Sequence, residues 1–135
     1  MGLDIGDKRI GVSISDSMNL TAQSKEVIKR TDHRQDLKII KKYIKEYQVN
    51  EIIVGLPKNM DGTLGPQAEK TKNYTNFLKN NLDLPIIFWD ERLSSREAEK
   101  LLIKADVSRS RRKGVIDQVA ASIILQGYLD FKNNQ

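Results

Sequence analysis

The sequence predicts an α/β fold with one mixed sheet of five strands and helices on both of its faces. Three observations carry this prediction. The chain opens with two runs, 2–6 and 10–15, in which apolar residues alternate with Gly, Asp or Ser, as in a tight hairpin. Two continuous apolar runs, 51–55 and 85–89, are typical of buried parallel strands. Helical periodicities alternate with these runs, so crossover connections follow an antiparallel meander.

The first half of the chain contains the meander and one helix. The turn of the hairpin spans 6–9, and a weaker third strand is expected over 23–29. Asp32 and Gln35 have the spacing of a capping box, which predicts that a helix begins there. Its apolar face is formed by Leu37, Ile40, Ile44 and Tyr47.

The second half alternates strands and helices. A loop rich in Pro, Gly and Asn covers 56–65, and a helix follows from Pro66 with Thr71, Tyr74, Phe77 and Leu78 on its inner face. After the strand at 85–89, Ser94 and Glu97 predict another capping box and helix. A basic loop is expected over 108–114, before a last helix over about 115–131. No linker divides the chain, so residues 1–135 are expected to form a single domain.

Composition excludes several kinds of chemistry. The 135 residues include no cysteine and one histidine, His33, so a disulfide framework, a thiol nucleophile and a multi-histidine metal site are excluded. An enzyme of this composition would depend on carboxylates, lysines or hydroxyls. No apolar run is long enough for a membrane span and no secretory signal is visible, which predicts a cytoplasmic protein without membrane contact.

The net charge of +5 is concentrated in one stretch. Residues 92–113 contain eight basic and three acidic side chains, and the rest of the chain is balanced overall. A local basic excess indicates an anionic partner, most simply a nucleic acid.

Three carboxylates are candidates for a common site. Asp4 interrupts an apolar strand, where aspartate is disfavoured, although bonding to hairpin amides would also explain it. Glu91 follows the carboxyl end of a buried strand, the edge at which open α/β sheets bind ligands, although an ion pair with Arg92 or Lys8 is an alternative. Asp117 is expected in the first turn of the last helix, where the helix dipole alone would favour an acid.

These three side chains are expected to meet at one edge of the sheet. The helix face that begins at Asp117 continues through Ala121, Ile124 and Tyr128, so it is predicted to pack inward. A site made only of oxygen ligands suits Mg²⁺ or Mn²⁺, and two such ions can assist hydrolysis of a phosphodiester.

Four blocks of sequence resemble the YqgF family, the pre-16S rRNA nucleases that are also described as Holliday-junction-resolvase-like. They are Leu3-Asp4-Ile5-Gly6-Asp7-Lys8-Arg9-Ile10-Gly11-Val12; Val54-Gly55-Leu56-Pro57 with Asn59-Met60-Asp61-Gly62-Thr63 and Gly65-Pro66-Gln67-Ala68; Asp90-Glu91-Arg92-Leu93-Ser94-Ser95; and Ile116-Asp117-Gln118-Val119-Ala120-Ala121 with Gln126-Gly127-Tyr128-Leu129. The similarity covers nearly the whole chain.

The resemblance implies a ribonuclease H-like fold and a nuclease that uses divalent metal ions. Its acidic triad falls on Asp4, Glu91 and Asp117, and its implied substrate is precursor 16S rRNA, with cleavage at the 5′ end during ribosome biogenesis. One departure is that only three residues precede Asp4, fewer than relatives usually carry. This predicts a short first strand or a misassigned start.

Further residues are expected to contact nucleic acid. Beside the proposed site these are Lys8, Arg9 and Arg92; a mobile clamp on the backbone is expected from Arg109, Arg111, Arg112 and Lys113. A substrate loop that contains Asn59, Gly62 and Thr63 is expected to cover the scissile phosphate. Each of these side chains has a simpler interpretation as solvated surface.

Alternative functions stay open at this point. The first is a resolvase that acts on branched DNA, for which a dimer would be needed, so a monomer and a homodimer are both considered. The second is a nucleic-acid-binding module that does not cleave. A sugar-kinase or actin-like ATPase is excluded by length, because those proteins close two such domains over the nucleotide.

Overall fold

The computed structural model describes residues 1–59, 61–90 and 109–134, and in the last range it describes side chains from Val119 onward. Its five strands are β1 (Gly2–Ile5), β2 (Arg9–Ser15), β3 (Ala22–Lys29), β4 (Ile52–Leu56) and β5 (Ile86–Asp90). They form one sheet in the order β3-β2-β1-β4-β5. The pairs β1–β2 and β2–β3 are antiparallel, and the pairs β1–β4 and β4–β5 are parallel. The expected mixed sheet of five strands is therefore confirmed.

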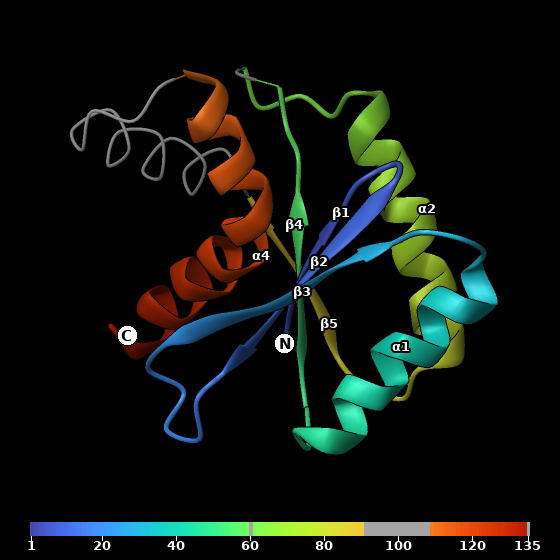
Figure 1. Cartoon of the computed structure of the whole chain (residues 1–135), viewed down its shortest axis with the longest axis vertical. Coiled ribbons are helices and arrows are strands. Elements are labelled where there is room, and N and C mark those ends of the chain that lie inside the picture. Colours follow the sequence, from blue (N-terminus) through green and yellow to red (C-terminus); the bar gives the residue numbers. More distant parts are fainter. Residues whose placement is uncertain (60, 91–108, 135) are drawn as a thin grey trace.

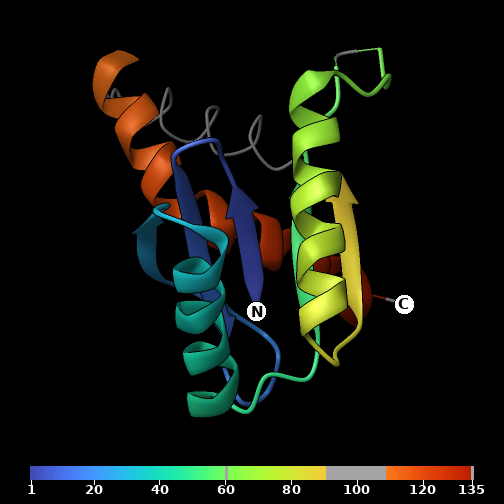
Figure 2. The same ribbon diagram turned by 90° about the vertical axis from the view of Figure 1, so that its right-hand side faces the viewer.

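Helices cover both faces of the sheet, as predicted. Helices α1 (His33–Glu46) and α2 (Pro66–Asn81) lie on one face, and α4 (Arg109–Asn133) lies on the other (Figure 1). The view turned by 90° shows α1 and α2 in front of the strands and α4 behind them (Figure 2). At the start of α1 the side chain of Asp32 accepts a hydrogen bond of 2.9 Å from the backbone N–H of Gln35, so the predicted N-cap is confirmed.

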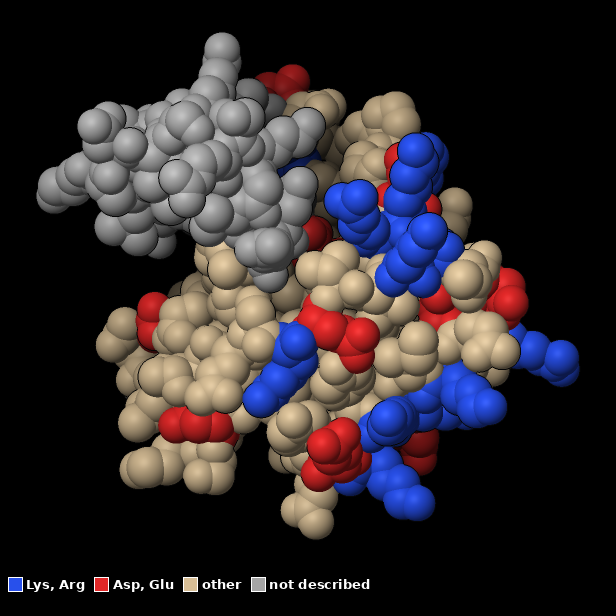
Figure 3. Space-filling model, viewed as in Figure 1, with Lys and Arg blue, Asp and Glu red and all other residues tan. Residues whose placement is uncertain are grey.

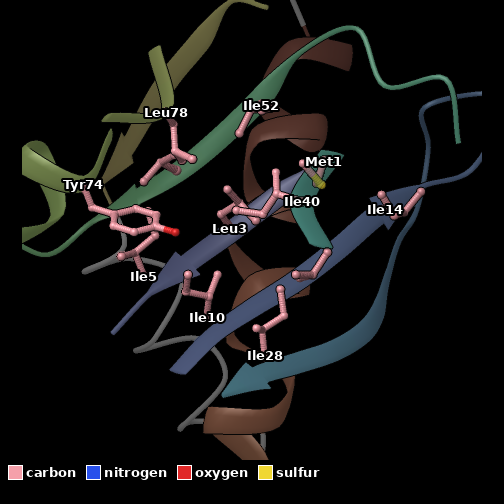
Figure 4. Close-up of a cluster of buried hydrophobic side chains, with 12 residues drawn as sticks. Met1, Leu3, Ile5, Ile10, Ile14, Ile28, Ile40, Ile52, Tyr74 and Leu78 are labelled. Atoms are coloured by element: carbon pink, nitrogen blue, oxygen red, sulfur yellow. The ribbon is translucent and has the colours of Figure 1, made fainter. Parts of the chain in front are cut away.

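The larger core lies between the sheet and the pair α1 and α2. Alternate residues of β1 and β2, among them Leu3, Ile5 and Ile10, point into it and meet Ile40 of α1 and Leu78 of α2 (Figure 4). The period of two in the opening hairpin is thus the pattern of a strand with one face in this core. The second face of the sheet packs on Ile124, Leu125 and Leu129 of α4.

The start of α4 differs from the sequence prediction. The stretch 108–114 was expected to be a loop, but the helix already begins at Arg109 and includes Gly114. Arg and Lys are good helix formers, and one internal Gly costs only about 1 kcal/mol relative to Ala. The expectation of a mobile loop is therefore wrong, because the segment that carries the proposed clamp is helical. The helix predicted from Ser94 lies outside the described residues.

Polar contacts fix the register of α4 on the sheet. The side-chain oxygen of Gln126 accepts a hydrogen bond of 2.9 Å from the backbone N–H of Ala22, and its nitrogen donates to the carbonyl of Leu20 at 2.9 Å. Near the middle of the helix, the hydroxyl of Ser13 donates to the carbonyl of Ala121 at 2.7 Å. These contacts hold α4 across β2 and β3 at two levels.

Candidate active site

Asp4 lies on the face of β1 that is turned towards α4. Its neighbours Leu3 and Ile5 belong to the core on the other face, so Gly2 and Asp4 alternate with them onto the α4 side. Asp4 is half-buried and pairs with Gly11 of β2. The site therefore begins with a carboxylate at the interface between the sheet and α4.

One end of the molecule gathers the chain segments that the sequence analysis singled out. The carboxyl ends of the parallel strands β1, β4 and β5 point to the same end as the first turns of α4 and the loop after β4 (Figures 1 and 2). In α/β sheets this edge is where ligands bind.

Small residues let α4 approach the sheet closely beside Asp4. A Cβ added to Gly2 would lie 2.5 Å from the Ser13 hydroxyl and 2.9 Å from the Ala121 carbonyl oxygen. A Cβ added to Gly11 would lie 3.3 Å from the Cβ of Ala121 and 3.6 Å from that of Asp4. Gly11 thus leaves space next to Asp4 that any side chain would fill, and Ala121 is the α4 residue at this level.

Position 117 lies one turn before Ala121 on the same side of α4. Strand β1 runs from Gly2 to Asp4 towards the carboxyl edge. Gly2 lies close to Ala121 and Leu125 of α4, whereas Gly11, the partner of Asp4, lies close to Ala121 only. Helix α4 therefore runs in the direction opposite to β1. One turn before Ala121 is therefore one turn further towards the carboxyl edge. Asp117 is about two turns into the helix rather than in its first turn, so the expectation based on the helix dipole was wrong.

The remaining candidates at this edge are placed only in part. Glu91 and Arg92 follow Asp90, the last residue of β5, and lie outside the described residues. Asp90 itself lies 3.9 Å from the ammonium of Lys58, which follows the end of β4. Arg109, Arg111, Arg112 and Lys113 occupy the first turns of α4, where side chains are not described.

The turn between β1 and β2 presents Lys8 and Arg9 as exposed side chains. Its backbone is closed by a hydrogen bond of 2.8 Å from the Gly6 N–H to the Arg9 carbonyl. The guanidinium of Arg30 donates to the Gly6 carbonyl at 2.7 Å, and the Arg30 N–H donates to the Lys8 carbonyl at 2.9 Å. Lys8 and Arg9 are therefore carried by a turn that directly follows the strand of Asp4 and is held in place.

Arg30 is itself held by buried groups of two helices. Its Nε lies 3.8 Å from a carboxylate oxygen of Asp36, which is 1% exposed, and its guanidinium carbon lies 4.6 Å from the ring centroid of Tyr74. Burial and the nearby Asp36 carboxylate raise the pKa of Tyr74 to about 12, while Arg30 acts in the opposite direction. Sequence reasoning missed this group, because its members are separated along the chain and only the fold unites them.

The loop after β4 is ordered by its own hydrogen bonds. The backbone N–H of Asn59 donates to the Thr63 carbonyl at 2.9 Å, and the Asn59 side chain donates to the Thr63 hydroxyl at 3.0 Å. Gly62 has a φ of 89°, which favours glycine. This compact turn lies at the carboxyl end of β4, and its proposed role over a phosphate stays a prediction.

The described side chains do not form a metal site by themselves. Within 1–59, 61–90 and 119–134, no three His, Cys, Asp or Glu side chains are grouped so that they could hold a metal ion. In the same parts no helix is long and apolar enough to cross a membrane. Of the three proposed ligands only Asp4 has a described side chain, because those of Glu91 and Asp117 lie outside the described residues.

The comparisons with known proteins identify the family. The family model RuvX, described as Holliday junction resolvase, matches residues 1–131. The chain belongs to this family. A protein of Halothermothrix orenii is 63% identical over 98% of this chain and 95% of its own length, and one of Clostridioides difficile is 58% identical over 99% and 95%. Both carry the description "Putative pre-16S rRNA nuclease". The RuvX family membership confirms the family resemblance and the expectation of a nuclease.

The structural comparison gives a match to a resolvase. Fowlpox virus resolvase, in complex with Holliday junction DNA, matches with a TM-score of 0.43 and 12% identity over 98% of this chain and 93% of its own.

Two other residues with possible binding chemistry have structural roles. Trp89 packs edge-on against Tyr128, with ring centroids 6.0 Å apart, and belongs to the core under α4. His33 is exposed at the start of α1, and its ring also contacts Phe77 at 4.8 Å between centroids.

Proposed function

We propose that this RuvX-family nuclease is a divalent-metal-dependent endonuclease that processes the 5′ end of precursor 16S rRNA. The observation that carries the proposal is the placement of Asp4 beside Gly11 on the α4 side of the sheet. Ala121 of α4 lies at the level of this pair, and position 117 lies one helical turn nearer the carboxyl edge. The substrate is supported by the description that the bacterial relatives share.

The chemistry of the available ligands fits Mg²⁺ or Mn²⁺. Asp4 offers carboxylate oxygens, which these ions prefer as ligands. Because residue 11 is glycine, no side chain from that position occupies the space beside Asp4. We infer that Asp4, Glu91 and Asp117 together hold two ions. When bound, such ions activate water and stabilise the leaving oxygen of a phosphodiester.

The protein's own residues would supply position and charge. Water would attack the phosphorus in line and lose a proton, while the bond from phosphorus to the 3′ oxygen breaks. The leaving 3′ oxygen takes up a proton, so the products carry a 3′-hydroxyl and a 5′-phosphate. Lys8, Arg9 and Arg92 steady the phosphates on either side of the broken bond, and the loop with Asn59, Gly62 and Thr63 covers it. Arg109, Arg111, Arg112 and Lys113 would bind the backbone independently of sequence from the first turns of α4. We place this activity in the cytoplasm, because the bacterial relatives are described as pre-16S rRNA nucleases.

A second candidate is cleavage of a four-way DNA junction, favoured by the description of the family model. That activity would need two sites in a dimer, whereas rRNA processing needs one site in a monomer or in either subunit of a homodimer. A module that binds without cleaving is the remaining alternative.

One cleavage experiment separates these candidates. Precursor 16S rRNA fragments and synthetic four-way DNA junctions are each incubated with the protein in Mg²⁺, in Mn²⁺ and in chelator. We expect cleavage of the rRNA fragment with either ion and none in chelator. Preferred cleavage of the junction would support the resolvase, and binding of both substrates without cleavage of either would support the non-catalytic module. Undiminished cleavage in chelator would contradict metal dependence.

A further inference from the structure

The chain has a second basic stretch outside residues 92–113. Residues 25–45 contain eight basic and three acidic side chains, which equals the excess in 92–113. The rest of the chain carries the compensating negative charge. Outside 92–113 the basic and acidic side chains are equal in number overall, but the basic ones are in excess on β3 and α1.

Five cations of α1 lie on one side of the helix, in what we call the α1 stripe. It consists of Arg34, Lys38, Lys41, Lys42 and Lys45, all of which are exposed. At 100° per residue they fall within an arc of about 100°, and at 1.5 Å per residue they extend over about 17 Å. The buried Ile40 faces roughly the opposite direction, into the core. The stripe is therefore a straight, solvent-facing row of positive charge on a helix whose opposite side packs in the core.

Of the four acids near the stripe, the exposed Glu46 lies at the end of α1, four residues after Lys42, and the other three are engaged elsewhere. Asp36 is buried against Arg30, Asp32 caps the helix, and Glu26 accepts a hydrogen bond from the hydroxyl of Tyr43. Within the described parts of the chain, no carboxylate forms an ion pair with a cation of the stripe. Several of the five are three or four residues apart, where like charges repel. An anionic partner would relieve this repulsion.

The stripe continues a basic path that begins at the site. Arg30 bonds the β1–β2 turn, which carries Lys8 and Arg9, to the segment that leads into α1, and Arg9 pairs with Lys29 in the sheet. Lysine and arginine side chains gather over the right-hand part of the surface in Figure 3, where α1, α2 and this turn lie in Figure 1. A polyanion bound at the carboxyl edge can therefore extend past the β1–β2 turn and along α1 over positive charge.

We propose that the α1 stripe binds the phosphate backbone of a double-helical arm of the nucleic acid that is cleaved at the carboxyl edge. This inference rests on the proposed function for its substrate. A row of about 17 Å matches the axial rise of about five phosphates along one strand, and a rigid row suits the regular spacing of a helix. Contacts of this kind add affinity and orientation without sequence preference.

Binding at several salt concentrations tests the proposal. The variant K38Q/K41Q/K45Q is compared with K72Q/K79Q/K132Q, which removes the same charge from α2 and from the end of α4. Affinity for an RNA hairpin that contains the cleavage region is measured in chelator, so that cleavage does not interfere. Loss of three phosphate contacts reduces the slope of log K against log salt by about 2.7, so between 50 and 200 mM salt the wild-type affinity falls about 40-fold more than that of the variant.

The length of the duplex arm decides where the stripe acts. We expect the reduced slope with an arm that extends two helical turns beyond the cleavage region and a wild-type slope with an arm too short to reach α1. The control variant should have the wild-type slope with both. An unchanged slope in K38Q/K41Q/K45Q, or an equal reduction with both arms, would overturn the proposal. If the wild type cleaves no RNA, the proposed function fails, but the slopes measured in chelator still decide the role of the stripe.

Discussion

At the scale of single residues, Arg30 joins parts of the molecule that are distant in sequence. Its guanidinium bonds the Gly6 carbonyl in the β1–β2 turn, pairs with the buried Asp36 of α1, and lies over the ring of Tyr74 of α2. From the sequence, Asp36 is an acid in a first helical turn and Arg30 is a surface cation. Neither pattern contains the information that the fold brings them together, so this group could not be predicted.

Tyr74 provides a test of this cluster at high pH. Its hydroxyl is buried without a hydrogen-bond partner in the described structure, so we expect Y74F to change the free energy of unfolding at pH 7 by less than about 1 kcal/mol. Because its pKa is raised from 10.0 to about 12, the unfolded state loses the proton first. Wild-type stability from this group is complete below pH 10 and is lost between pH 10 and 12.

Urea unfolding at pH 7 and at pH 11.5 measures the effect. Other tyrosines and the lysines also titrate in this range, so the informative quantity is the difference between the two proteins. The wild type should lose about 2 kcal/mol more than Y74F between these pH values. Equal losses would show that burial does not hold the Tyr74 proton.

At the scale of elements, the strands and α2 follow their sequence patterns, whereas α4 does not. The alternation in 2–6 and 10–15 and the apolar runs before residues 56 and 90 predicted β1, β2, β4 and β5 to within about one residue at most ends. These patterns report burial directly. The start of α4 was misplaced because a run of Arg, Lys and Gly has no apolar period, and charge alone does not distinguish a loop from an exposed helix.

The contact between α4 and β1 can be tested at Gly2. In G2A the new Cβ would lie 2.8 Å from the Leu125 Cβ and 2.9 Å from the Ala121 carbonyl, so the helix must move away from the sheet. We expect a loss of about 1–3 kcal/mol in the free energy of unfolding, measured by urea denaturation.

The double variant G2A/S13A is the control for the nearest contact. Removing the Ser13 hydroxyl relieves only the approach of 2.5 Å and leaves both contacts with α4. The double variant should therefore be no more stable than G2A. Recovery to the stability of S13A would mean that the hydroxyl, and not the helix, limits the space at Gly2.

At the scale of the whole molecule, the sheet topology explains why residues from opposite ends of the sequence share one edge. Strand β1 is the central strand of the sheet and is parallel to β4. Helix α4 crosses the face of the sheet to which Asp4 belongs, close to Asp4 itself. The sequence predicted that Asp4 belongs to a site because an acid in an apolar strand is costly. It could not predict the close approach of α4, which depends on Gly2, Gly11 and Ala121 acting together, or the stripe on α1, whose charge is cancelled in the overall count.

The most direct test of the metal-dependent nuclease is the variant D4N. It keeps the size of the side chain and removes the negative charge that would hold a divalent ion. D83N is the matched control, because Asp83 is exposed in the connection between α2 and β5. Cleavage of a precursor 16S rRNA fragment is measured in Mg²⁺, and binding of the same fragment is measured in chelator. We predict that D4N loses cleavage by at least about 100-fold and still binds as well as the wild type, while D83N matches the wild type in both assays. Cleavage by D4N at the wild-type rate would contradict the account.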